Sequence, residues 1–114
     1  MIPHGVEVFV GLDPIDLRWS FDRLTGIVTE RIGRDARCGA LFVFFGKRSD
    51  AIKVFFYDGS GMCIFYIRLD VRIYRLPEVP AGEASVVIDD RALDDLLDGI
   101  DVEVKMRKKL LRTH

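Results

Sequence analysis

Basic side chains next to aromatic ones are the strongest chemical signal in this sequence. Residues 47–75 hold six bases and three acids, a local net charge of +3. The bases are Lys47, Arg48, Lys53, Arg68, Arg72 and Arg75, and the aromatic residues between them include Phe55, Tyr57, Tyr66 and Tyr74. Cations beside aromatic rings suit phosphate contact and base stacking, the parts of nucleic-acid binding that are independent of sequence. Surface bases are also ordinary solubilising residues, so both interpretations stay open.

Charge is strongly segmented along the rest of the chain, although the formal net charge is only −1. Residues 77–104 hold nine acids and one base, and residues 105–114 hold five bases and no acid. The acids Asp94, Asp95 and Asp98 fall in a predicted helix, where they can dock on a basic partner. The basic segment is typical of tails that follow a phosphate backbone and also of solvated, disordered ends.

The residues that usually carry catalysis are scarce. His4 and His114 are the only histidines and lie at the ends of the sequence, where a side chain is hard to hold in catalytic geometry. Cys38 and Cys63 form no CxxC motif and have no histidine nearby for a zinc site. Four acids, Asp16, Asp22, Asp50 and Asp58, lie on different predicted elements, where caps and turns explain them. We therefore expect no enzyme, no metal and no cofactor.

The hydrophobic pattern indicates which elements position these side chains. Alternating valines predict a strand over residues 6–10, and helical spacing predicts an amphipathic helix over 19–32. Short β-prone runs separated by turn residues predict strands over 41–45, 52–57, 62–67, 72–74 and 85–88. Asp89 then caps a last helix whose leucines recur at positions i, i+3 and i+4.

These elements predict an α+β fold: a mainly antiparallel, twisted sheet of five to six strands, with one helix after the first strand and one C-terminal helix. A length of 114 residues fits one domain, expected over 1–102, with 103–114 as a disordered basic tail. Because several strands are apolar on both faces, helices or a second copy of the chain must cover the sheet on both sides, and we expect a homodimer. Neither a signal peptide nor a membrane span is visible, so we expect a cytoplasmic protein.

The sequence also resembles a known family of bacterial transposable elements. It is similar to TnpB, the small accessory protein of the insertion sequence sixty-six family, which is distinct from the RNA-guided nuclease of the same name. The matching segments are DLRWSFDRL at 16–24, LFVFFGKRSD at 41–50, IKVFFYDGSGMC at 52–63 and LLDGID at 96–101, within a resemblance that spans residues 2–102.

The resemblance implies a non-enzymatic protein that assists a separate transposase. The matching basic positions are the candidates for contact with element DNA or with the transposase: Arg18, Lys47, Arg48, Lys53, Arg68 and Arg72. A pure adaptor is the alternative, docking on the transposase through Asp94, Asp95 and Asp98 without touching DNA.

Overall fold

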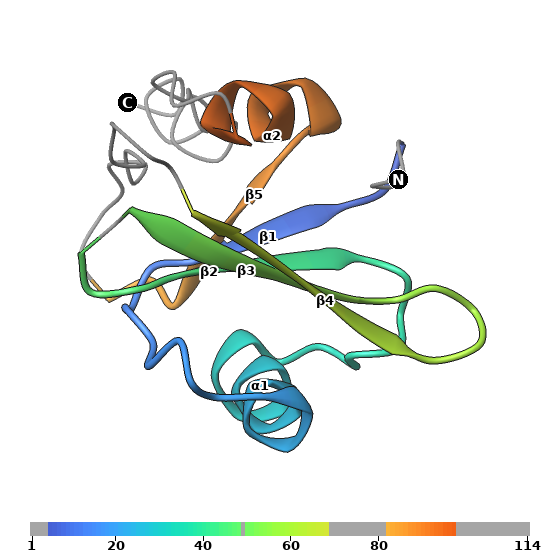
Figure 1. Ribbon diagram of the computed structural model, residues 1–114. Coiled ribbons are helices and arrows are strands. Elements are labelled where there is room, and N and C mark those ends of the chain that lie inside the picture. The colour runs from blue at the N-terminus through green and yellow to red at the C-terminus, as the bar shows by residue number, and fades with distance from the viewer. Residues whose placement is uncertain (1–4, 49, 69–81, 98–114) are drawn as a thin grey trace.

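A five-stranded sheet with one helical layer on each face forms the body of the protein (Figure 1). The computed structural model describes residues 5–48, 50–68 and 82–97. The sheet order is β4-β3-β2-β1-β5. The strands are β1 (Val8–Gly11), β2 (Leu41–Phe45), β3 (Ala51–Tyr57), β4 (Met62–Arg68) and β5 (Ser85–Ile88), and the helices are α1 (Phe21–Ile27), its continuation η1 (Val28–Ile32) and α2 (Asp90–Leu97). The α+β class and the positions of both helices are confirmed.

The sheet is mixed, with three antiparallel pairs and one parallel pair. β2 with β3, β3 with β4, and β1 with β5 are antiparallel, whereas β1 and β2 run parallel. Residues 12–40 connect that pair and contain α1 and η1, so the connection is long enough for the crossover that parallel neighbours require. The prediction of a mainly antiparallel sheet therefore holds for three of the four strand pairs. The pair of β1 with β2 is the exception.

The helix predicted over 19–32 starts at Phe21 and changes geometry half-way. Its second part, η1, is a π-helix, and the backbone N–H of Gly33 donates to the Val28 carbonyl at 2.9 Å. Gly33 then ends it with φ +78°, a left-handed conformation that glycine adopts without a Cβ clash. The wider last turn places Arg31 and Ile32 against the segment that follows β1.

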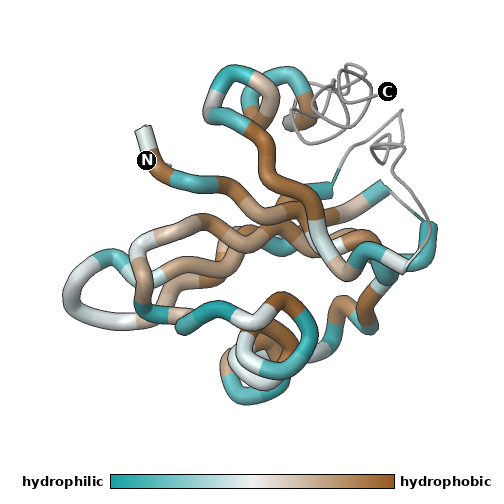
Figure 2. Tube along the Cα trace, turned by 180° about the vertical axis from the view of Figure 1, so that it is seen from behind, coloured by the Kyte–Doolittle hydropathy of each residue, from teal (hydrophilic) through white to brown (hydrophobic). Residues whose placement is uncertain are grey.

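Alternate residues of the central strands fill two separate cores. On the α2 side, residues such as Val43, Val54 and Phe56 pack with Leu93 and Leu96. On the α1 side, the core comprises Phe9, Ile15, Leu24, Val28, Ala36, Ala40, Phe42, Phe44 and Phe55. Figure 2 shows the hydrophobic residues concentrated in the strands between the two helical layers.

Helices cover much of the sheet within a single chain, which weakens the argument for a homodimer. Phe42, Phe44 and Phe55 are at most 1% exposed within a single chain, because α1 and η1 cover them. On β4, Phe65 is half-buried, so this edge of the sheet is covered less completely. The homodimer stays a prediction, to be checked by light scattering. The predicted strand over 72–74 and the tail over 103–114 lie outside the described residues.

Candidate functional site

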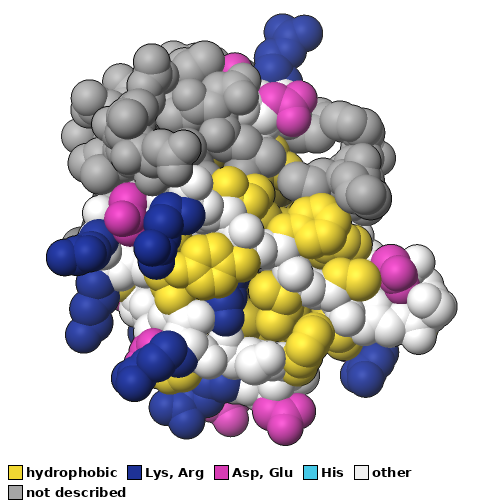
Figure 3. Space-filling view, in the orientation of Figure 1, with side chains coloured by type: hydrophobic (Ala, Val, Ile, Leu, Met, Phe, Trp, Pro, Cys, Tyr) yellow, Lys and Arg dark blue, Asp and Glu magenta, His cyan; other side chains and the backbone are white. Residues whose placement is uncertain are grey.

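Three of the predicted basic residues line one open hollow at the end of the sheet. Its volume is about 330 Å³, and it is lined by Ile15, Asp16, Leu17, Lys47, Arg48, Asp50 and Arg68. Three segments meet there: the loop before α1, the β2–β3 hairpin and the end of β4. In Figure 3, Lys and Arg side chains gather on the left of the face shown, beside apolar side chains that lie over the sheet. We call this site the basic hollow.

Backbone pairing and strand register bring these segments together. The Ile15 N–H donates to the Phe45 carbonyl at 2.8 Å, and Ile15 and Gly46 form an isolated parallel bridge. In the β3–β4 ladder, Ala51 stands opposite Arg68, so the last residue of β4 lies beside the β2–β3 hairpin. Residues far apart in the chain therefore share one surface.

Gly46 allows the loop before α1 to approach the hairpin closely. A Cβ at position 46 would lie 2.5 Å from Leu17 Cδ1 and 2.9 Å from its Cγ, closer than carbon atoms can pack. A larger residue would require the Leu17 side chain to move. Glycine at this position thus lets Leu17 lie directly against the hairpin at the basic hollow.

Exposed cations outnumber acids at the basic hollow. Lys47, Arg48 and Arg68 are exposed. Arg18, whose side chain is 90% exposed, forms a salt bridge with Asp16, with 2.6 Å between Nη2 and Oδ2. The hydrogen bonds from Arg18 hold the pKa of Asp16 well below its usual range and raise the pKa of Arg18. Among the residues that the structure describes, three cations and two carboxylates, those of Asp16 and Asp50, line the hollow. Because Arg18 also pairs with Asp16, the balance of charge favours an anionic ligand.

Arg68 joins the basic hollow to an exposed aromatic ring. Its Nη2 donates to the hydroxyl oxygen of Tyr66 at 3.0 Å, and this hydrogen bond raises the pKa of Arg68. The Tyr66 residue is 48% exposed. The combination of cation and aromatic ring predicted from composition is therefore present at this end of β4.

Lys53 does not meet the expectation of a surface cation. It is 8% exposed, and its Nζ donates to the carbonyl oxygen of Trp19 at 2.6 Å. Side chains alternate between the two faces of a strand, so the side chain of Lys53 points to the same face as that of Phe55. Its partner on β4 is Tyr66. Lys53 thus fastens the residues before α1 to the sheet, which argues against an ammonium free to contact DNA.

Replacement of Lys53 by methionine distinguishes a structural role of this lysine from contact with DNA. Lys53→Met keeps an apolar stem of similar length but leaves the Trp19 carbonyl without its donor, so we expect a loss of about 1–3 kcal/mol in the free energy of unfolding. The dependence of DNA affinity on salt should be unchanged, because no phosphate contact is lost. Urea unfolding and DNA titration at several salt concentrations measure both. Unchanged stability with a weaker salt dependence would instead show that Lys53 contacts phosphate.

The structure describes two of the three acidic residues that were predicted to bind a partner. Asp94 is exposed and Asp95 is half-buried on α2, which covers the opposite face of the sheet from α1 (Figure 1). Asp89 caps this helix as predicted, accepting a hydrogen bond from the Ala92 N–H at 2.8 Å. Asp98, like the candidate cation Arg72, lies outside the described residues.

Asp58 serves the β3–β4 turn. Its Oδ1 accepts hydrogen bonds from the N–H groups of Ser60 and Gly61 at 2.9 and 3.0 Å, and from the Ser60 hydroxyl at 2.9 Å. These donors stabilise the charged carboxylate and lower the pKa of Asp58 from 3.8 to about 2. Asp22 lies in the first turn of α1. In the part of the chain that the structure describes, no three His, Cys, Asp or Glu side chains group in a way that could hold a metal.

The lowered pKa of Asp58 predicts a loss of stability in acid. The unfolded chain takes up a proton near pH 3.8 and the folded chain only near pH 2, so stability falls as the pH drops through this window. Asp58→Ala should be less stable than the original protein at pH 7, and the difference should shrink as the pH approaches 2. Urea midpoints at pH 7, 4 and 2.5 test this. A difference that stays constant from pH 7 to 2.5 would contradict it.

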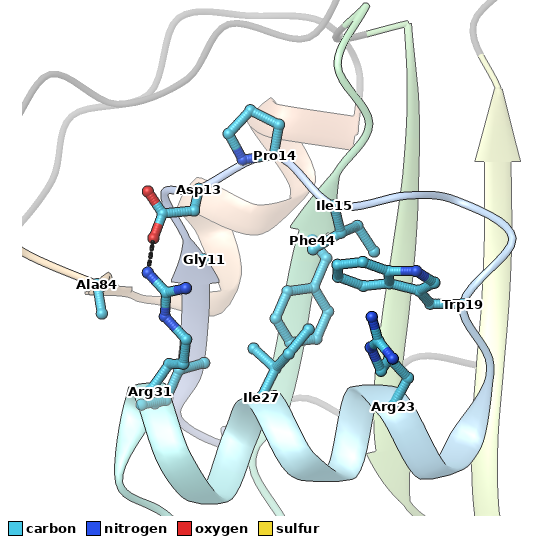
Figure 4. Close-up of a pocket in the computed structure, with 11 residues that line it drawn as sticks. Gly11, Asp13, Pro14, Ile15, Trp19, Arg23, Ile27, Arg31, Phe44 and Ala84 are labelled. Atoms are coloured by element: carbon cyan, nitrogen blue, oxygen red, sulfur yellow. Dashed lines mark hydrogen bonds and ion pairs between the residues drawn. The ribbon is translucent and has the colours of Figure 1, made fainter.

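A second, smaller hollow of about 130 Å³ lies between α1–η1 and the segment after β1 (Figure 4). Phe44 lies at its base, the Arg23 guanidinium stands 4.6 Å from the centroid of the Trp19 ring, and Arg31 is paired with Asp13. The sequence pattern did not single out this hollow. The spacing of Arg23, Ile27 and Arg31, four residues apart along one helix face, is the signal that could have indicated it.

Comparison with known proteins identifies the family. A family model described as "IS66 Orf2 like protein" matches residues 6–107. The chain belongs to this family. The resemblance noted from the sequence is confirmed, and membership places the IS66 Orf2-like chain among proteins associated with the transposition of insertion sequences.

Two relatives of Sinorhizobium fredii (strain NBRC 101917 / NGR234) match nearly the whole chain. The uncharacterized protein y4hO is 35% identical over 103 residues, which cover 89% of this chain and 88% of the relative. The uncharacterized protein y4jC is 30% identical over 109 residues, which cover 96% of this chain and 92% of the relative. No solved structure matches. In the described ranges, no helix is long and apolar enough to cross a membrane.

Proposed function

We propose that this IS66 Orf2-like protein assists transposition by binding DNA at the basic hollow while it assembles with a separate transposase. The observation that carries the proposal is the convergence of Lys47, Arg48 and Arg68 on one open surface, with Arg18 paired to a carboxylate of the same hollow. Family membership supports the link to transposition. Such a role belongs in the bacterial cytoplasm, where the element's DNA lies.

The chemistry of the hollow suits a phosphate backbone. Its cations are exposed and come from different segments, so they can follow successive phosphates. Each cation that neutralises a phosphate releases condensed counterions, which supplies affinity without reading the sequence. The excess of cations over carboxylates makes the electrostatic contribution to binding attractive.

A mobility-shift titration tests the proposal. The full chain is titrated against a DNA fragment carrying one element end, with and without the transposase, at low and at physiological salt. We expect a shift by the protein alone that weakens as salt rises, and a tighter complex when transposase is present. Absence of any shift by the protein alone, at every salt concentration, would reject direct DNA binding.

The second candidate function is the pure adaptor, favoured by the exposed acid on α2. If α2 docks on a basic surface of the transposase, neutralising Asp94 and Asp95 to Asn should abolish transposase capture. Neither the original protein nor this variant should then shift DNA on its own. A pull-down with purified transposase, alongside the mobility shift, measures both. Unchanged capture by Asp94→Asn/Asp95→Asn would contradict the adaptor.

We also propose that the protein performs no chemistry on DNA itself. Purified protein with Mg²⁺ or Mn²⁺ should neither nick nor join supercoiled or linear DNA. Cleavage that depends on the metal and disappears in Asp16→Ala would overturn this part of the proposal.

A further inference from the structure

Tyr66 presents an aromatic ring to solvent at the border of the basic hollow. It is the more exposed of the two large hydrophobic side chains found exposed in the described ranges, at 48%, and the other is Phe21 at 44%. Its hydroxyl accepts a hydrogen bond from Arg68, which itself lines the hollow. The Arg68 guanidinium therefore connects the exposed ring of Tyr66 to the basic hollow, the proposed site of phosphate contact.

The Tyr66 ring is held by its surroundings. Lys53 Nζ lies 5.8 Å from the ring centroid and the Arg68 guanidinium carbon lies 5.9 Å from it. Lys53 is in turn fixed by its hydrogen bond to the Trp19 carbonyl. A ring anchored beside two cations loses little freedom when a ligand covers it, so it is suited to act as a platform.

Phe55 and Tyr57, from the same sequence stretch, and Phe21 on α1 do not meet these conditions. Phe55 is fully buried beneath α1. Tyr57 is half-buried, and its hydroxyl donates to the Gly59 carbonyl at 2.9 Å within the β3–β4 turn. Phe21 is exposed but comes from α1, where its ring packs against Phe55 with 6.3 Å between centroids. Only Tyr66 among these four combines exposure with a contact to a residue of the hollow.

An aromatic platform beside cations distinguishes single-stranded from double-stranded DNA. In a duplex each base face is covered by its neighbours, whereas an unpaired base can stack on a protein ring while its phosphates contact lysine or arginine. We propose that Tyr66 stacks on an unpaired base while the basic hollow holds the adjoining phosphates, so that this surface binds single-stranded DNA in preference to duplex. This inference rests on the proposed DNA binding and names the form of DNA that is bound.

Fluorescence anisotropy with two probes tests the preference. One probe is a labelled strand of about 16 nucleotides, within the range of known single-strand site sizes, and the other is the same strand annealed to its complement. The full chain should bind the single strand about tenfold more tightly than the duplex, the amount that one good base–aromatic stack provides. Tyr66→Ala should lose this advantage and leave duplex affinity unchanged, and Tyr66→Phe should keep it.

Phe21→Ala is the matched control, because it removes an aromatic side chain of similar exposure that the structure does not join to the hollow. It should leave the affinity for the single strand unchanged, and thermal unfolding of each variant shows whether it is folded. Equal affinity of the original protein for both probes, or an equal loss for both in Tyr66→Ala, would overturn the stacking inference while DNA binding stands. Failure to bind either probe would reject the proposed function, and this inference with it.

Discussion

Reversing the charge of Lys47 and Arg48 is expected to weaken DNA binding by about tenfold or more at low salt, to a similar extent for every DNA sequence. Both side chains line the basic hollow and are exposed, and carboxylates in their place would face the phosphates. Each lost phosphate contact should also flatten the dependence of log K on log salt by roughly 0.9. The measurement is the affinity of Lys47→Glu/Arg48→Glu for one DNA fragment across a series of salt concentrations.

A variant with the same change in net charge separates local contact from general electrostatics. Arg37 and Arg91 are exposed and do not line the basic hollow. Arg37→Glu/Arg91→Glu should keep the original salt slope and lose little affinity. Both double variants should remain folded, because exposed substitutions usually change the free energy of unfolding by less than about 0.5 kcal/mol. An unaltered slope in Lys47→Glu/Arg48→Glu would show that the β2–β3 hairpin does not touch DNA.

The largest effect on stability is expected from Phe42→Ala. Phe42 is fully buried in the core beneath α1 and stacks on Phe9 with 5.5 Å between ring centroids and 14° between ring planes. Truncation removes this contact and leaves a cavity, which costs about 3–5 kcal/mol, a large part of the roughly 5–15 kcal/mol that stabilises a typical domain. Guanidinium unfolding monitored by circular dichroism gives the change.

Phe42→Leu is the control for this prediction. It keeps most of the volume of the side chain and should cost less than about 1.5 kcal/mol, since hydrophobic substitutions that nearly conserve volume are tolerated best. A loss below about 1 kcal/mol for Phe42→Ala would mean that the core beneath α1 is not organised around Phe42 and Phe9.

The positions of most elements followed from the sequence because their causes are local. The uninterrupted β-prone run at Leu41–Phe45 is β2, and the run at Ser85–Ile88 is β5, with the bounds that were predicted. Asp89 caps α2 through a hydrogen bond that spans only three residues. The turn held by Asp58 likewise depends on neighbours two and three positions away. Periodicity, capping and turn chemistry act over a few residues, so the sequence alone was enough to predict them.

The pairing of strands and the composition of the candidate site were decided only by the tertiary structure. β1 could have paired in either direction, and its parallel alignment with β2 follows from the crossover through α1 and η1. Arg68 reaches Lys47 and Arg48 because the β3–β4 register places it beside the hairpin, whereas the neighbouring base Lys53 faces inward and bonds to Trp19, 34 positions away in the chain. Whether a lysine binds solvent or a buried carbonyl depends on which distant segment covers it, and local sequence carries no information about that segment.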